Sequence, residues 1–208
     1  MGLRQGFGCP ARASGLTGAV LLVGSAFAAY PGAAQAENLT YQEVKLGVLA
    51  HDVHFLGGKE HGVDVNPELL LQSPIEDSWL ANVPGYLRWA LQPRPMIGLE
   101  INTAGYTDQL YLGATWTWQV ASGVLTPDDG LVFSYGFGPG FNDGEIQSNR
   151  SDRKSLGGHV LFRESFEFGY RFTPVYQVSA YLDHISNGGL DRYNQSINDV
   201  GIRLGVRF

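Results

Sequence analysis

Apolar and polar residues alternate with a period of two along most of the chain after residue 42. The clearest segment is the last, where Val200, Ile202, Leu204, Val206 and Phe208 are separated by Gly201, Arg203, Gly205 and Arg207. Successive side chains of a β-strand point to opposite faces, so this pattern predicts a strand with one apolar face. Because the other face consists of glycine and arginine, it suits a polar barrel interior, and the apolar face suits lipid.

The same alternation recurs along the chain and predicts eight strands. They are expected near residues 43–54, 62–72, 95–105, 108–120, 130–138, 156–171, 174–187 and 196–208. We therefore expect an all-β fold, an eight-stranded antiparallel transmembrane β-barrel, with a lumen filled by side chains. Residues 73–92 fit the pattern least, and three alternatives stay open there: a surface loop, a strand extension or a short interfacial helix.

The first 36 residues predict a cleaved signal peptide. Arg4 and Arg12 precede an apolar stretch at 16–29, and Ala34-Gln35-Ala36 supplies the small residues that cleavage requires. The apolar stretch is short for a transmembrane helix, and an uncleaved anchor is the alternative. The expected organisation is a signal peptide at 1–36, followed by an exported outer-membrane barrel at 37–208.

The expected mature chain is acidic. The leader holds two of the 14 Lys and Arg residues and none of the 20 Asp and Glu residues, which leaves a net charge of −8. This balance argues against nucleic acid as a partner, because phosphate binding depends on Lys and Arg. The single cysteine, Cys9, lies in the leader, so the mature chain relies on no disulfide.

Two polar residues interrupt the apolar face of the seventh expected strand. Its even positions are Tyr176, Val178, Ala180, Leu182, His184 and Ser186. His184 and Ser186 therefore share the lipid-facing side, which is an unfavourable place for polar groups without a function. A neutral imidazole can take the proton of a serine hydroxyl and so activate it as a nucleophile. A third group, from a neighbouring strand, must orient the imidazole.

The surrounding residues resemble the PagL-type lipid A 3-O-deacylases. The resemblance rests on residues 184–190, His-Ile-Ser-Asn-Gly-Gly-Leu, on Asn194 and on the spacing to the terminal Phe208, with support from residues 51–53, 59–62 and 157–172. It implies an integral outer-membrane serine esterase that hydrolyses the 3-O-linked hydroxyacyl chain of lipid A. Ser186 would be the nucleophile, His184 the base and Asn194 a residue that supports the transition state.

We further expect the backbone amides of Asn187 and Gly188 to act as oxyanion donors. Serine–histidine chemistry implies neither a metal nor an organic cofactor. The expected partners are lipid A or lipopolysaccharide as substrate and the outer membrane itself. The oligomeric state stays open, with a homodimer as one alternative, as do the acyl-chain length and whether the activity is latent in the cell.

The resemblance fails at the acid of the triad. Asn198 stands where the best-known members carry glutamate, and its amide oxygen can orient the imidazole while stabilising the imidazolium less than a carboxylate does. Glu164 is a second candidate, because same-face pairing across the turn at 173–174 places it opposite or diagonal to His184. Asp183 and Asp199 have the parity of inward-facing residues.

Other groups of residues have simpler interpretations. A metal site at His51, His54, His61 and Asp64 matches no standard ligand spacing, so we favour ordinary packing there. The stretch 136–140, Gly-Phe-Gly-Pro-Gly, predicts a turn or bulge, and basic residues within 148–154 are candidates for contact with lipopolysaccharide.

Two other classes of function remain as alternatives. One is a non-enzymatic small outer-membrane barrel, structural or adhesive, in which Asn198 marks a lost acid. The other is a soluble periplasmic barrel that holds a ligand, which would be extracted without detergent.

Overall fold

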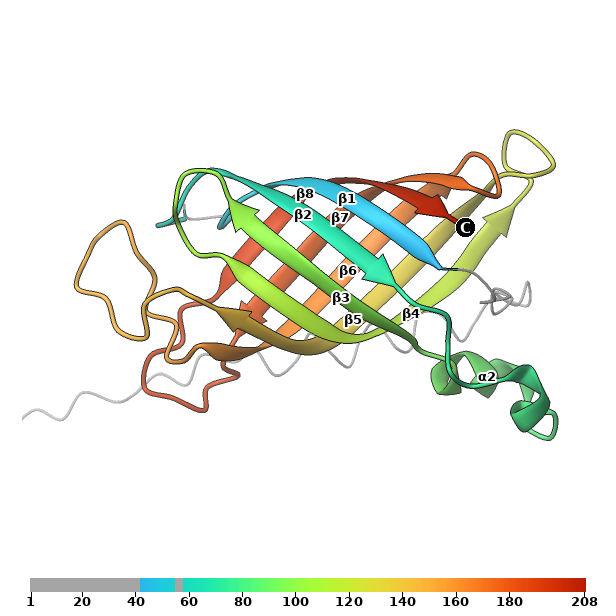
Figure 1. The fold of residues 1–208 in the computed structure, drawn as a ribbon, viewed down its shortest axis with the longest axis horizontal. Coiled ribbons are helices and arrows are strands. Elements are labelled where there is room, and N and C mark those ends of the chain that lie inside the picture. The colour runs from blue at the N-terminus through green and yellow to red at the C-terminus, as the bar shows by residue number, and fades with distance from the viewer. Residues whose placement is uncertain (1–41, 55–57) are drawn as a thin grey trace, which may run out of the picture. The chain divides into compact units, whose positions relative to one another are not determined.

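The computed structural model describes residues 42–54 and 58–208, and its strands close into one antiparallel barrel (Figure 1). Each strand pairs with the next, and β8 pairs with β1. The strands are β1 (Glu43–Ala50), β2 (Val63–Leu70), β3 (Arg94–Asn102), β4 (Gln109–Ser122), β5 (Gly130–Asn142), β6 (Val160–Arg171), β7 (Tyr176–Ser186) and β8 (Ile197–Arg207). All eight expected strands are confirmed. The expected signal peptide, residues 1–36, lies outside the described residues.

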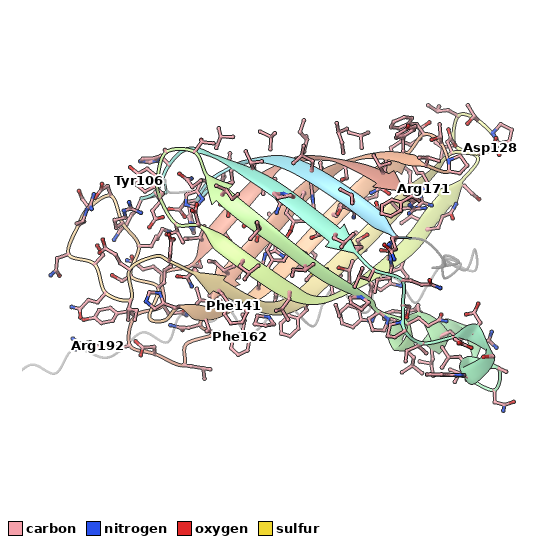
Figure 2. All side chains as sticks on the ribbon, in the orientation of Figure 1. Tyr106, Asp128, Phe141, Phe162, Arg171 and Arg192 are labelled. Carbon is pink, nitrogen blue, oxygen red and sulfur yellow. The ribbon has the colours of Figure 1, made fainter. Side chains whose placement is uncertain are left out.

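The two faces of the barrel wall are inverted relative to a soluble protein. Along β8, Ile202 and Leu204 are 64% and 60% exposed, whereas Arg203 between them is 1% exposed. Phe141 and Phe162 likewise project outward from β5 and β6 (Figure 2). The apolar surface therefore faces outward and the charged side chains face the lumen, as the alternation predicts.

Buried charges in the lumen neutralise one another. Arg203 forms ion pairs with Glu68 and Glu167 at 2.9 and 3.2 Å, and Lys45 forms an ion pair with Glu167 at 2.8 Å. A further ion pair joins Arg163 to Glu100 at 2.9 Å. Pairing of this kind is what makes buried charges tolerable. The lumen is therefore filled by side chains, as expected for eight strands.

The ambiguous segment between β2 and β3 is helical. A 3-10 turn, η2 (Asp77–Leu80), precedes a short helix, α2 (Gly85–Leu91). The Trp89 ring contacts Trp118 of β4 at 4.9 Å between centroids, and Trp116 Nε1 donates a hydrogen bond to Ala90 O at 3.1 Å. These contacts fix the helix beside β4. Among the described residues, no helix is long and apolar enough to cross a membrane.

The expectation of a turn or bulge at 136–140 is wrong, because β5 continues through it to Asn142. The pairing of these residues with β6 is regular, and the irregularity in β4 and β5 lies instead between Gln119 and Ala121. A Cβ atom on Gly138 would lie 2.1 Å from the carbonyl oxygen of Leu112 on the neighbouring strand. This glycine therefore permits a close approach of two strands, which is the other common reason for glycine in a strand.

Candidate functional site

His184 lies between Ser186 and Asn198 on the outward face of β7 and β8. Its Nε2 atom is 3.0 Å from Ser186 Oγ, and its Nδ1 atom is 2.7 Å from Asn198 Oδ1. An amide oxygen can only accept, so Nδ1 carries the proton and Nε2 keeps a lone pair directed at the serine hydroxyl. This is the tautomer in which an imidazole can take a proton from serine.

The strand registers bring these side chains together. His184 is the direct partner of Asn198 in the β7–β8 pairing and of Glu164 in the β6–β7 pairing. The expected position of Glu164 opposite His184 is therefore confirmed, but the hydrogen bond from the ring goes to Asn198. Asp183 and Asp199 are both buried in the lumen, as their parity predicts.

Asn187 organises the loop that follows the nucleophile candidate. Its side-chain oxygen accepts a hydrogen bond from Gly189 N at 2.8 Å, and its side-chain nitrogen donates to the carbonyl of Tyr193. Gly188 has a φ of +65°, in the left-handed region that glycine adopts at little cost. The loop conformation next to Ser186 therefore depends on the Asn-Gly-Gly sequence.

Asn194 closes the same loop. Its Oδ1 atom accepts a hydrogen bond from the backbone nitrogen of Asn187 at 3.0 Å. The Asn187 amide, expected as an oxyanion donor, is therefore engaged within the loop in this structure. Because the oxygen of the Asn194 amide is fixed on Asn187, its two N–H donors are directed elsewhere.

An apolar cleft of about 430 Å³ lies beside the candidate nucleophile. Phe162, one of its lining residues, is the direct strand partner of Ser186. The other lining residues come mainly from β5, β6 and the loop after β7, and include Phe137, Pro139, Val160, Leu161 and Leu190. Its size falls in the range of about 300–1,000 Å³ that is typical of ligand clefts.

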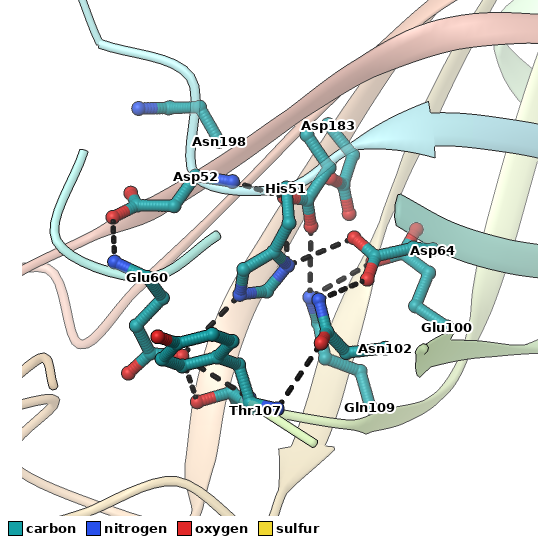
Figure 3. Close-up of polar contacts among 12 residues, drawn as sticks. His51, Asp52, Glu60, Asp64, Glu100, Asn102, Thr107, Gln109, Asp183 and Asn198 are labelled. Carbon is teal, nitrogen blue, oxygen red and sulfur yellow. Dashed lines mark hydrogen bonds and ion pairs between the residues drawn. The ribbon is translucent and has the colours of Figure 1, made fainter. Parts of the chain in front are cut away.

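On the lumen side of the barrel wall, the loop after β1 contributes a buried network centred on His51 (Figure 3). The Nδ1 atom of His51 lies 2.8 Å from Asp64 and 3.3 Å from Asp199, and Nε2 lies 3.3 Å from Glu60. Burial lowers the pKa of His51, but its hydrogen bonds to Asp199, Asp64 and Glu60 outweigh this and raise it to about 12. Burial raises the pKa of Glu60, but hydrogen bonds from His51 and from the Lys154 and Thr107 amides lower it to about 2. His51 is therefore the cation of this network.

The structure does not gather the four residues considered for a metal site. His61 is exposed and contacts the ring of Tyr106, whereas His54 faces Asn198. The Asp64 carboxylate beside His51 also accepts a hydrogen bond from Asn102 at 2.8 Å. N–H donors already aim at these oxygens, so the arrangement is a hydrogen-bonded network.

The basic residues of the loop between β5 and β6 differ in accessibility. Arg150 is exposed and forms an ion pair with Asp152 at 2.8 Å. Lys154 is buried and bonded within the chain, so it is not positioned to contact lipopolysaccharide.

A closed eight-stranded sheet with an apolar exterior and a charged lumen defines an outer-membrane β-barrel. The family described as lipid A 3-O-deacylase (PagL) matches residues 88–207, a span that contains His184, Ser186 and Asn198. The chain belongs to this family, whose members are hydrolases of lipid A. No curated protein sequence matches the chain.

The chain is similar to solved structures of outer-membrane barrels, and the first of those described below supports the fold. The crystal structure of the outer membrane enzyme PagL is 16% identical, with a TM-score of 0.56, and the match covers 79% of this chain and 98% of that chain. The N-terminal β-barrel domain of Pseudomonas aeruginosa OprF is 12% identical, with a TM-score of 0.46 and coverage of 81% and 97%. Neisserial surface protein A is also 12% identical, with a TM-score of 0.43 and coverage of 81% and 96%.

Proposed function

We propose that this barrel hydrolyses the ester of the 3-O-linked hydroxyacyl chain of lipid A, with Ser186 as nucleophile and His184 as base. The observation that carries the proposal is the continuous hydrogen-bonded line from Ser186 Oγ through the His184 ring to Asn198 Oδ1. Membership of the lipid A 3-O-deacylase family supplies the substrate class.

The proposed reaction has two steps. Ser186 Oγ attacks the ester carbonyl carbon while His184 Nε2 takes its proton, and collapse of the tetrahedral intermediate breaks the bond to the sugar oxygen, which receives that proton from His184. Water, deprotonated by His184, then attacks the carbonyl carbon of the acyl-serine. The bond to Ser186 Oγ breaks, Oγ receives the proton from His184, and the hydroxy fatty acid is released. Asn198 holds the Nδ1–H tautomer in both steps.

Access to the site fits a lipid substrate. Ser186 and His184 lie on the outward face, so an acyl chain can reach them from the membrane without entering the lumen. With the start of β1 and the end of β8 on the periplasmic side, the loop between β7 and β8 lies at the outer leaflet, where lipid A resides. The apolar cleft lined by Phe162 and Leu190 then accommodates the acyl chain.

The decisive experiment is mass spectrometry of lipid A after incubation with detergent-purified protein. We expect the wild type to remove one hydroxyacyl chain, and Ser186→Ala to lower the rate by about 10³-fold or more, because the nucleophile is lost. Ser151→Ala, an exposed serine in the loop between β5 and β6, is the matched control and should react as the wild type.

Two results would contradict the proposal. Equal deacylation by the wild type and Ser186→Ala would remove Ser186 from the mechanism. An unchanged lipid A with every variant would favour the non-enzymatic barrel.

Asn194 is proposed as the oxyanion donor. Its side-chain oxygen is bound to Asn187 N, so its side-chain NH₂ group is available to donate to the oxyanion. Replacing Asn194 with aspartate keeps an oxygen to accept from Asn187 N but removes both N–H donors. We expect this variant to lower kcat by about 10²-fold or more, since loss of one oxyanion donor has an effect of that order. Wild-type kcat in Asn194→Asp would limit Asn194 to its role in the loop.

A further inference from the structure

Asn198 has a second contact, on the side of its amide away from His184. Its Nδ2 atom lies 3.1 Å from His54 Nε2 and 3.3 Å from His54 Nδ1. His54 follows β1, and closure of the barrel places β1 beside β8. The backbone continues this pairing, because Val53 N donates to Asn198 O at 2.7 Å. A residue from the first hairpin is thus held against the candidate triad.

This contact matters because an amide has two different ends. If the Asn198 side chain rotated by half a turn, its NH₂ group would face His184 Nδ1. The ring would then have to accept at Nδ1 and carry its proton on Nε2, so it could no longer act as a base toward Ser186. A glutamate at this position would have two equivalent oxygens and would not need to be oriented. An asparagine triad therefore requires a group that fixes the amide.

His54 can fix the amide through Nδ1, which lies 3.3 Å from Asn198 Nδ2 and accepts from it. A neutral imidazole carries its proton on the other nitrogen, Nε2, which donates to the Asp52 carboxylate. His54 Nε2 lies 2.8 Å from Asp52 Oδ1 and 2.9 Å from Lys154 Nζ. Lys154 Nζ is also 2.9 Å from Asp52 Oδ1 and donates to Ser196 O at 2.9 Å. The carboxylate and the ammonium offset each other's charge beside the ring.

The two residues that hold His54 are themselves buried. Asp52 and Lys154 are only 2% and 7% exposed. Asp52 has a φ of 52°, in the left-handed region, and its Oδ2 atom accepts from the backbone nitrogens of Lys59 and Glu60 at 2.7 and 3.1 Å. These contacts hold the Asp52 carboxylate directly behind the His54 imidazole.

We propose that His54 is a positioning residue that accepts from Asn198 Nδ2 and so turns the amide oxygen of Asn198 toward His184. The inference rests on the proposed function of Ser186 and His184. Asp52 and Lys154 hold His54. Together with Asn198, these three residues replace the single carboxylate of a serine–histidine–acid triad.

A double-mutant cycle tests this role, with His54 and Asn198 as its two positions. His54→Phe keeps a ring but removes the acceptor, so we expect kcat on purified lipid A in micelles to fall about tenfold, with KM within about twofold. His54→Gln retains an acceptor oxygen and should keep most of the activity. In the Asn198→Glu background, His54→Phe should lower kcat by less than about twofold, because a carboxylate needs no orientation.

A second measurement does not depend on turnover. The ¹⁵N chemical shifts of the His184 ring report which nitrogen carries the proton, and we expect Nδ1–H in the wild type and a mixture of tautomers in His54→Phe. If His54→Phe fails to assemble, the comparison is made with His54→Leu. Assembly is checked by the heat-dependent gel mobility of the folded barrel.

The outcomes separate this inference from the proposed function. Equal loss of kcat in both backgrounds, or an unchanged His184 tautomer, would overturn the role of His54. Absence of lipid A hydrolysis by the wild type would overturn the proposed function, while a shifted tautomer in His54→Phe would still support the orientation of Asn198 by His54.

Discussion

Replacing His184 with glutamine is expected to lower kcat for lipid A deacylation by about 10²- to 10⁴-fold, the usual contribution of a general base. Glutamine can keep a hydrogen bond to Ser186 Oγ, but its amide cannot take up the proton that the serine loses. Because the acyl chain would bind the cleft as before, KM should change little. The measurement is initial-rate kinetics with purified lipid A in detergent micelles.

The matched control for this variant is His159→Gln. His159 is exposed and lies just before β6, and its backbone carbonyl, which accepts from Asn142 N, is unaffected by the substitution. We expect wild-type kinetics from it. A comparable loss of kcat in both variants would point to a general effect on the end of the barrel that carries the β5–β6 and β7–β8 loops. It would argue against His184 as the base.

The second large effect is on stability. Replacing His51 with leucine is expected to lower the free energy of unfolding by about 3–5 kcal/mol, because it leaves buried carboxylates without their cation. The side chains of His51 and Glu60 are 0% exposed, and Asp64 and Asp199 approach the same ring. Guanidinium unfolding from phospholipid vesicles, followed by tryptophan fluorescence, measures the change. His61→Leu, on an exposed neighbour, should stay within about 0.5 kcal/mol of the wild type.

The effect of His51 should depend on pH in a defined direction. Its pKa rises from 6.5 to about 12 on folding, so its contribution is complete below 6.5 and is lost as pH rises toward 12. The difference between the wild type and His51→Leu should therefore be larger at about pH 6 than at about pH 9. A difference that increases with pH would show that His51 is not the cation of the network.

The period-two alternation predicted the architecture because lipid and lumen impose opposite demands on neighbouring residues. The same parity placed His184, Ser186 and Asn198 on the outward face and Asp199 in the lumen, as the structure shows. The short turn at 173–174 fixed the β6–β7 register closely enough to place Glu164 opposite His184. Strand geometry was therefore sufficient to predict most of the fold and the arrangement of the candidate triad.

The sequence was a poorer guide where contacts depend on loops or on barrel closure. The glycines at 136–140 suggested a turn because glycine serves both turns and close strand packing, and only the neighbouring carbonyl of Leu112 distinguishes the two. For His54 the sequence predicts only ordinary packing. Its place could be inferred from the pairing of β1 with β8, but the left-handed backbone at Asp52 breaks the alternation just before it.

The adjacency of Asn198 and Asp199 on opposite faces of β8 has a consequence for insertions and deletions. Removal of a single residue from the loop at 187–196, with a compensating insertion nearer Phe208, would move Asp199 to the place of Asn198 in the pairing with β7. The Asn198 amide would then enter the lumen and the Asp199 carboxylate would face His184, while His51 would lose an anionic neighbour. In this barrel, the chemistry at the lipid surface and the charge balance of the interior are therefore linked by the length of one loop.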